Sequence, residues 1–268
     1  PNPKVAGKGH ALLKSAGIEV IAHAMPHESA HLLAHFALNQ QKQRPYVTLK
    51  AALSLDGKLA TQTGDSQWIT IPEARKAGHY LRGLHDAILI GKGTLLADNP
   101  TLNVRYGFET KAPARVLMIN SFTGISPEVV QSFHFFDTTI APTILVYPES
   151  LEIPPLILAA LQKGGVKLLP LPQVTPAALL EALFKAGYMS LFIEGGAAIY
   201  DAFIAADLVD EYALFYGAKL IGSPNALELW RNSDVTDLAF APELEIFETK
   251  VLGKAPEINF QIRAKRRR

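Results

Sequence analysis

The sequence predicts an α/β fold: a mixed, mainly parallel sheet with helices on both faces and antiparallel strands at the C-terminal end. From residue 46 onward, short apolar runs alternate with segments of helical periodicity, the order typical of parallel strands joined by crossover helices. After residue 206 the helical periodicity stops and three strand-like runs follow. The visible strand–helix units are too few for an eight-fold barrel.

The first strand and the first helix of this fold have clear signals. Residues 46–53 alternate Val47, Leu49, Ala51 and Leu53 with Thr48 and Lys50, which predicts a strand. Thr70-Ile71-Pro72-Glu73 matches a capping box, so we expect the Thr70 hydroxyl to cap the next helix. Ala74, Ala77, Leu81 and Leu84 then form its apolar face.

The remaining elements follow in order along the chain. Short buried strands are predicted at residues 87–90, 116–119, 144–147, 166–169 and 191–193. Helices are predicted at residues 156–163, 176–185 and 197–206, with Thr175 as an N-cap, Pro176 at the first helical position and Gly187 after the end. Strands are predicted at residues 211–216, 244–252 and 258–263, the last two as a hairpin around residues 253–256.

Composition and charge exclude several classes of protein. With 268 residues, 49 % hydrophobic and 19 % charged, the chain can bury a proper core and is not disordered. The absence of cysteine excludes a disulfide scaffold, a thiolate nucleophile and a Cys-ligated zinc site. No apolar run reaches the roughly 18 residues of a membrane span, and no leader indicates secretion, so we expect a cytoplasmic protein.

The basic C-terminal tail conceals an acidic body. Residues 263–268 hold five cations, and without them 21 basic residues face 25 acidic ones, a net charge of −4. Such a tail can bind nucleic acid through phosphate contacts, but a solvated terminus is the simpler interpretation. We therefore expect neither a nucleic-acid partner nor a membrane partner.

A polar stretch at residues 40–45 predicts a domain boundary. Residues 7–39 before it indicate a small segment of helix and strand. Within that segment, His27-Glu28-Ser29-Ala30-His31 matches the spacing of a zinc-protease helix, although nothing nearby offers a third ligand. His35 extends the row, which favours a histidine stripe on a helix surface over a zinc site.

Two glycine turns follow predicted strands and precede helices: Gly91-Lys92-Gly93-Thr94 and Gly195-Gly196-Ala197-Ala198. Neither matches a complete nucleotide-binding motif, and each alone is equally well a tight turn. Ligands of open α/β sheets bind at the carboxyl ends of strands, so both turns could line one cleft. Glu194 ends the apolar strand at this point, where carboxylates with perturbed pKa values are common.

Taken in order, these motifs resemble the reductase domain of the bacterial bifunctional riboflavin-biosynthesis deaminase–reductases. The matching strings, spread over residues 44 to 250, are Arg44 to Lys50, Ser54-Leu55-Asp56-Gly57-Lys58, Gly64 to Thr70, Leu81-Arg82, His85 to Gly91, Thr94, Asp98-Asn99-Pro100, Leu102, Arg105 and Ile193-Glu194-Gly195-Gly196. The resemblance implies a dihydrofolate-reductase-like fold that assembles as a dimer or tetramer.

The resemblance also divides the chain into two parts. Residues 1–9 resemble the stretch after the deaminase zinc site of these proteins, so residues 1–43 would be a deaminase remnant and residues 44–268 the reductase domain. The deaminase signature needs cysteines, which this chain lacks, so zinc would belong only to the absent deaminase domain. We accordingly expect a piece of a longer protein, with no metal site of its own.

The implied reaction is NADPH-dependent reduction of 5-amino-6-(5-phosphoribosylamino)uracil to its ribitylamino product, with hydride transfer to the ribose C1′. Lys58 and Glu194 are the candidates for polar catalysis. Substrate would be held by Ser66, Arg82, Leu102, Arg105 and Glu194, the two arginines on its phosphate. NADPH would contact Ala52, Trp68, Thr94, Asp98, Ser121, Gly196, Ala197, Ala198, Ile199, Tyr200, Asp201 and Ala202.

Two departures from the family pattern leave the choice between NADPH and NADH open. Phe122-Thr123-Gly124 follows Asn120-Ser121 with no basic residue, and Lys92 replaces a residue that is usually small. Three alternatives also stay open: a related reductase of the same fold acting on another pterin or pyrimidine, a zinc hydrolase using His27 and His31, and a non-catalytic assembly module.

Overall fold

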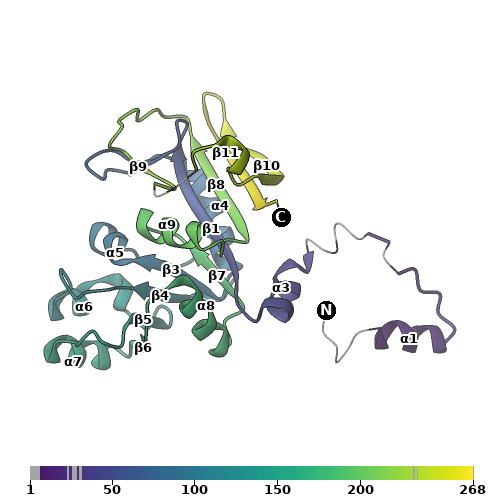
Figure 1. The fold of residues 1–268 in the computed structure, drawn as a ribbon, viewed down its shortest axis with the longest axis horizontal. Coiled ribbons are helices and arrows are strands. Elements are labelled where there is room, and N and C mark those ends of the chain that lie inside the picture. The colour runs from purple at the N-terminus through teal and green to yellow at the C-terminus, as the bar shows by residue number, and fades with distance from the viewer. Residues whose placement is uncertain are drawn as a thin grey trace.

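A nine-stranded sheet of order β10-β11-β8-β1-β7-β3-β4-β5-β6 forms the centre of the protein in the computed structural model, which describes residues 7–22, 24, 25, 29, 32–231, 233 and 235–267 (Figure 1). Its strands are β1 (Tyr46–Ser54), β3 (Ala87–Gly91), β4 (Ala114–Met118), β5 (Thr143–Pro148), β6 (Lys167–Leu171), β7 (Ser190–Ile193), β8 (Glu211–Gly217), β10 (Leu244–Lys254) and β11 (Glu257–Arg266). A separate small sheet pairs β2 (Lys58–Ala60) with β9 (Leu227–Glu228).

The pairing is mostly parallel, as the sequence predicts. Strand β1 pairs in parallel with β7 and β8, and the order continues in parallel from β7 through β3, β4 and β5 to β6. Only β11 breaks the pattern, running antiparallel to both β8 and β10. The predicted C-terminal hairpin is therefore confirmed, and the observed strand ends lie within a few residues of those expected.

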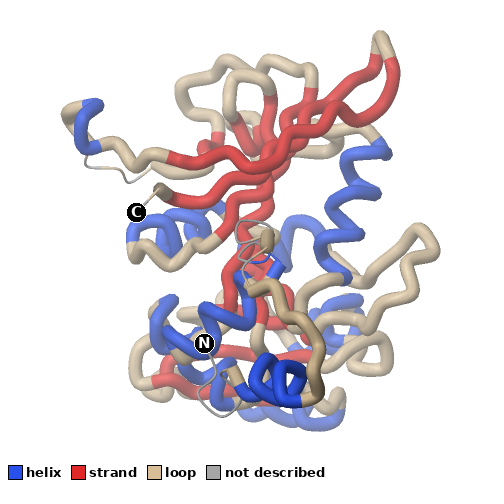
Figure 2. Tube along the Cα trace, turned by 90° about the vertical axis from the view of Figure 1, so that its right-hand side faces the viewer, coloured by secondary structure: helices blue, strands red, loops and turns tan. Residues whose placement is uncertain are grey.

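Helices cover both faces of the sheet because alternate strand residues point to opposite sides. The helices are α1 (Lys8–Ser15), α3 (Ala34–Lys42), α4 (Pro72–Gly83), α5 (Lys92–Asp98), α6 (Pro127–Ser132), α7 (Pro155–Lys163), α8 (Pro176–Lys185) and α9 (Ala197–Ala205), with short 3-10 turns η1 (His134–Phe136) and η2 (Leu238–Phe240). Leu89 packs with α8 and α9 on one face, whereas its neighbours Ile88 and Ile90 pack with α4 to α7 on the other. Figure 2 shows the strands between these helices.

The predicted capping box of α4 is wrong. The helix begins at Pro72, its N-cap is Ile71, and no side chain caps it. The Ile71 N–H instead donates to Asn259 Oδ1 at 2.8 Å, and the Thr70 carbonyl accepts from Arg75 Nη1 at 2.7 Å. A residue of β11 thus binds the start of α4, where the local sequence predicts a cap formed by Thr70 and Glu73. The second predicted cap is confirmed, because Thr175 Oγ1 accepts from the Ala178 N–H at 3.2 Å.

A buried arginine organises the loops beside β4, and sequence patterns give no hint of it. Arg115 is completely buried on β4, and its guanidinium donates to the carbonyls of His134 at 2.9 Å and Ala141 at 3.0 Å, and to Thr143 Oγ1 at 2.8 Å. Burial lowers its pKa to about 10. The adjacent Phe135 and Phe136 are also buried, so both rings belong to the core.

The N-terminal segment lies beside the sheet. Helix α3 ends at Lys42, inside the polar stretch where a boundary is predicted, and Asn39 ties its end to the sheet by donating to the Met189 carbonyl at 2.9 Å. Helix α1 has no buried residue and lies away from the strands in Figure 1. Residues 7–22 contain this helix but not the expected strand.

In the histidine row, His27, Glu28 and His31 lie outside the described residues. Within the part of the chain that the structure describes, no group of three metal-ligating side chains occurs. No described helix is both long enough and apolar enough to span a membrane.

Candidate active site

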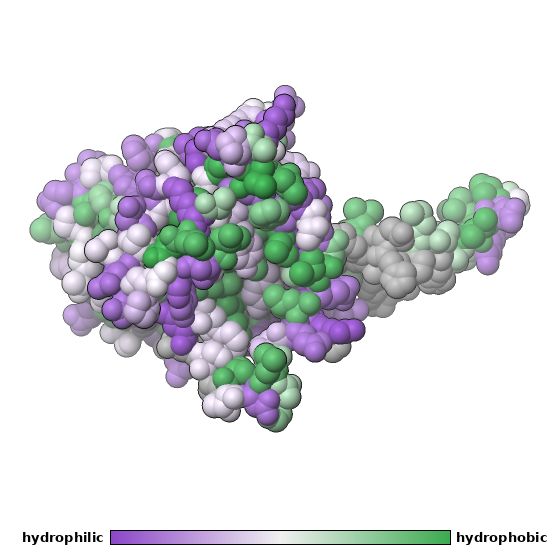
Figure 3. Space-filling view, turned by 90° about the horizontal axis from the view of Figure 1, so that it is seen from above, coloured by the Kyte–Doolittle hydropathy of each residue, from purple (hydrophilic) through white to green (hydrophobic). Residues whose placement is uncertain are grey.

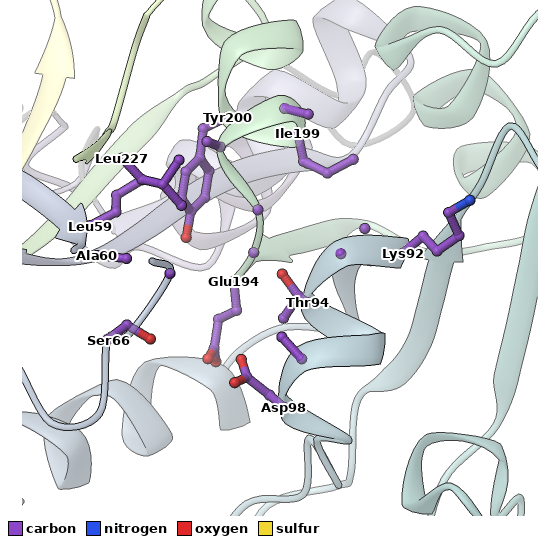
Figure 4. Close-up of a pocket in the computed structure, with 18 of the residues that line it drawn as sticks. Leu59, Ala60, Ser66, Lys92, Thr94, Asp98, Glu194, Ile199, Tyr200 and Leu227 are labelled. Carbon is purple, nitrogen blue, oxygen red and sulfur yellow. The ribbon is translucent and has the colours of Figure 1, made fainter. Parts of the chain in front are cut away.

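A cleft of about 890 Å³ opens at the carboxyl ends of the central strands (Figure 4). The loop after β3 supplies Gly91 to Thr94, the loop after β4 supplies residues 119–121, and the loop after β7 supplies Glu194 to Ala198. The prediction that both glycine turns line one cleft is thus confirmed. Its volume lies within the range of sites that hold small ligands and cofactors.

Glycine is required in these turns because they approach each other closely. A Cβ on Gly195 would lie 2.8 Å from Thr94 Oγ1, and one on Gly91 would lie 3.0 Å from Ile199 Cγ1. Gly196 has φ 82°, a left-handed conformation that favours glycine. The two loops can therefore meet only while these positions lack side chains.

The N-terminus of α9 faces this cleft without a side-chain cap. Its N-cap is Gly196, and the N–H groups of Ala197 and Ala198 find no acceptor among the residues described. Both residues line the cleft. Unpaired amides at the positive end of a helix dipole favour an anionic ligand such as a phosphate.

Glu194 is held at the cleft by a two-pronged ion pair with Arg82. Arg82 Nε lies 2.7 Å from Glu194 Oε1 and Arg82 Nη2 lies 2.9 Å from Oε2. Both side chains are nearly buried, at 10 % and 11 % exposure. Burial alone would raise the pKa of Glu194, but the charges of Arg82 and Lys50 outweigh it and hold the pKa below its usual value. Glu194 is therefore an anion at neutral pH.

Lys50 is the functional candidate that sequence reasoning missed. Leu49 pairs with Ile193 across β1 and β7, so the register places Lys50 and Glu194, each one residue further along, side by side. Lys50 lines the cleft, and its ammonium lies 5.8 Å from the centre of the Phe215 ring without a hydrogen bond to the described residues. Burial lowers its pKa, against the opposing charge of Glu194. The sequence signal that could have indicated Lys50 is that it is the one charged residue in the apolar run 46–53.

Lys58, predicted to be catalytic, is engaged elsewhere. Its ammonium pairs with Glu228 Oε1, joining β2 to β9, and it does not line the cleft. Neighbouring Asp56 accepts from the Ser54 hydroxyl at 2.6 Å and from the Gly222 N–H at 2.7 Å. The Ser54 hydroxyl, with the Gly222 and Ile221 amides, lowers the pKa of Asp56 to about 2. This motif therefore fixes a turn against the 219–222 loop.

An indole and a guanidinium stack on the wall of the cleft. Trp68 is 57 % exposed, and the Arg75 guanidinium carbon lies 4.4 Å from the centre of its ring. Lys219 Nζ donates to the Trp68 carbonyl at 2.6 Å, which ties this loop to the one held by Asp56. On the facing wall, Asp98 accepts from Gln67 Nε2 at 3.3 Å.

Most of the predicted site residues line this cleft. They are Ala52, Ser66, Trp68, Thr94, Asp98, Ser121, Glu194, Gly196, Ala197, Ala198, Ile199, Tyr200 and Ala202. Five of the predicted residues do not: Lys58, Arg82, Leu102, Arg105 and Asp201. Asp201 accepts from the Arg231 N–H at 2.8 Å, and Leu102 is buried with φ 53°. Arg105 is exposed, and its N–H donates to His79 Nδ1 at 3.2 Å.

Comparison with known proteins gives one consistent result. The family model described as the RibD C-terminal domain matches residues 45–254. The riboflavin biosynthesis protein RibD of Bacillus amyloliquefaciens is 35 % identical over 255 residues, covering 94 % of this chain and 67 % of that protein. The RibD protein of Aquifex aeolicus is 36 % identical, covering 83 % of this chain and 60 % of that protein. The chain thus spans about two thirds of the length of such relatives.

A solved structure agrees with these relatives. The Thermotoga maritima protein described as a diaminohydroxyphosphoribosylaminopyrimidine deaminase/5-amino-6-(5-phosphoribosylamino)uracil reductase superposes with a TM-score of 0.80 at 28 % identity. The match covers 99 % of this chain and 69 % of that one.

Proposed function

Because the chain belongs to the RibD C-terminal domain family, we propose that it reduces 5-amino-6-(5-phosphoribosylamino)uracil to the ribitylamino product with NADPH. The observation that carries this proposal is one cleft in which Lys50 and Glu194, neighbours across β1 and β7, lie beside a glycine turn with unpaired helix amides. The deaminase half of the reaction sequence is not assigned to this chain, since the chain has no cysteine for that zinc site.

The cleft fits a dinucleotide such as NADPH. The Ala197 and Ala198 amides would bind its pyrophosphate, and Trp68 and Thr94 would line its path. When bound, NADPH supplies the hydride that adds to the ribose C1′. The protein must then hold the sugar in place, keep water out and deliver one proton.

We assign delivery of the proton to Lys50 rather than to Lys58. As hydride adds to C1′, the bond between C1′ and the ring oxygen breaks, and that oxygen takes up one proton. Lys50 lines the cleft, and we take its ammonium as the proton donor because its lowered pKa favours release of the proton. Glu194, kept anionic by Arg82, orients Lys50 and accepts hydrogen bonds from ribose hydroxyls.

The phosphate of the substrate needs cations that are not already paired. Arg82 is neutralised by Glu194, so we propose that it positions this carboxylate instead of binding phosphate. Arg75 lines the cleft and is the better placed guanidinium. Roles for Ser66, Leu102 and Arg105 in substrate binding stay predictions from the family resemblance.

The reaction is tested with paired lysine variants. We expect Lys50→Met to lower the rate of NADPH oxidation by about a hundredfold or more, the usual range for a lost general acid. Its affinity for NADPH should stay within about threefold of wild type, and Lys58→Met should keep most of the activity, because Lys58 pairs with Glu228 outside the cleft. Turnover and nucleotide affinity would be followed by nicotinamide absorbance and fluorescence.

Three outcomes would count against the proposal. If Lys58→Met abolishes turnover and Lys50→Met does not, the proton donor is the wrong lysine. If the wild-type protein binds NADPH but does not oxidise it with this substrate, a related reductase with another pterin or pyrimidine substrate takes its place. If it binds no nucleotide, the reductase assignment fails.

We propose that residues 1–43 are the C-terminal remnant of a deaminase domain and residues 44–268 the reductase domain. Leu12 of α1 is 71 % exposed and Ile21 is 76 % exposed, and no residue of α1 is buried. Apolar side chains of this kind are normally covered by further protein, which supports assigning the segment to another domain. We also propose a cytoplasmic location, as the family resemblance implies.

We also propose that the chain forms a homodimer or homotetramer through β10 and β11. Val251 and Phe260 lie directly opposite each other in this hairpin and are 63 % and 40 % exposed. Ile246, on the same strand as Val251, is 56 % exposed. Figure 3 looks down on this end of the molecule and shows hydrophobic side chains at its surface. Covering such an edge with a second copy would remove it from water.

A further inference from the structure

Lys92 is a cation of the cleft that the proposed reaction does not use. It begins α5 after β3, and its ammonium donates to Ser121 Oγ at 2.5 Å and lies 3.3 Å from the Ser121 carbonyl. Strands β3 and β4 are neighbours, with Gly91 paired to Met118, so the loops that follow them meet here. Lys92 forms no ion pair with a carboxylate of the described chain. Its charge is therefore available to a ligand.

Lys92 lies at the end of the cleft away from the reacting groups. In Figure 4, Thr94 and Ile199 lie between Lys92 and the side that holds Ser66 and Glu194. The two acids of the cleft lining, Asp98 and Glu194, are both on the far side of Thr94 from Lys92. The wall beside Lys92 consists of neutral polar residues and apolar ones.

A dinucleotide in this cleft has one orientation consistent with these charges. Its nicotinamide must face Lys50 and Glu194 for hydride transfer, and its pyrophosphate fits the amides of Ala197 and Ala198. The adenosine half then extends toward Lys92. Sites that take NADH place a carboxylate on the adenosine ribose, whereas sites that take NADPH place a cation on its 2′-phosphate.

We propose that Lys92 and Ser121 bind the 2′-phosphate of NADPH and make this chain select NADPH over NADH. The inference rests on the proposed function and adds a specificity-determining residue to it. The ammonium and the hydroxyl would each bind a phosphate oxygen, as charge-assisted hydrogen bonds do elsewhere. The three residues after Ser121 include no basic residue, but Lys92 supplies the charge from the loop after the neighbouring strand β3.

The test measures binding without turnover. NADPH, NADH, 2′,5′-ADP and 5′-ADP would be titrated by calorimetry into wild type, Lys92→Met, Lys92→Arg and Lys163→Met. Lys163 is exposed at the end of α7 and does not line the cleft, so its variant controls for loss of one positive charge. We expect Lys92→Met to bind NADPH and 2′,5′-ADP about ten- to a hundredfold more weakly, with NADH and 5′-ADP within about threefold of wild type.

Each result decides one point. A phosphate contact at this site would be supported if Lys92→Arg keeps most of the wild-type affinity for NADPH that Lys92→Met loses. Lys163→Met should bind NADPH as the wild type does. If Lys92→Met binds NADPH as wild type does, or if wild type prefers NADH, the inference is overturned while the reductase proposal stands. If the wild type binds neither dinucleotide, both the inference and the proposed function fail.

Discussion

Replacing Arg82 by methionine should lower the free energy of unfolding, because it leaves the Glu194 carboxylate without the cation that neutralises it. The change keeps an apolar stem but removes both bonds to Glu194, at 2.7 and 2.9 Å, from a pair that is about one-tenth exposed. Removing one partner of a buried ion pair costs about 3–5 kcal/mol, because the other charge stays buried without its partner. That loss is a large fraction of the roughly 5–15 kcal/mol that stabilises a typical protein.

The pH dependence of this loss follows from the pKa of Glu194. In the wild type the folded pKa lies below 4.5, so the ion pair stabilises above that pH and is lost as pH falls through the folded value. In Arg82→Met only Lys50 still opposes the effect of burial, so the folded pKa of Glu194 rises and the stabilisation that the folded protein gains on ionising this group shrinks. The difference in unfolding free energy between the two proteins should therefore be small at pH 4 and largest at pH 7.

Urea denaturation at both pH values measures this difference. Lys185→Met is the matched control, because it breaks an exposed pair with Glu181 and should cost less than about 1 kcal/mol. The reasoning is refuted if Arg82→Met costs no more than the control, or if its cost does not change with pH.

Two further predictions concern packing and assembly. In Gly217→Ala the new Cβ would lie 2.0 Å from the Ile69 carbonyl oxygen, so the backbone must shift at a cost of about 1–3 kcal/mol. Gly93→Ala is the control, because nothing lies within 4 Å of a Cβ there. A melting temperature of Gly217→Ala no lower than that of Gly93→Ala would contradict this prediction. Val251→Glu should lower the mass measured by analytical ultracentrifugation to that of one chain, because a carboxylate on the β10 face opposes burial of that face. This interface would be ruled out if the wild type is already a monomer, or if the variant forms the same oligomer as the wild type.

Some of the candidate site could be read from sequence because its signals are local. Glu194 and Gly195 directly follow an apolar run, and a strand end in an α/β sheet is where ligands bind. The partners of long side chains could not be read in this way. Arg82 reaches Glu194 across 112 residues and Lys58 reaches Glu228 across 170, so their roles depended on segments that no spacing relates.

The sequence by itself determined the chain order of the strands of the main sheet and of most helices, the parallel core with its antiparallel end and the meeting of two glycine turns, because alternation and turn residues act over a few positions. The tertiary structure alone decided that Lys50 rather than Lys58 lines the cleft and that Asn259 rather than Thr70 serves the start of α4. Register between β1 and β7 and contacts between distant segments fix these outcomes. Polar and charged side chains form hydrogen bonds and ion pairs with the partners that folding brings close to them, and those partners are often distant in the sequence.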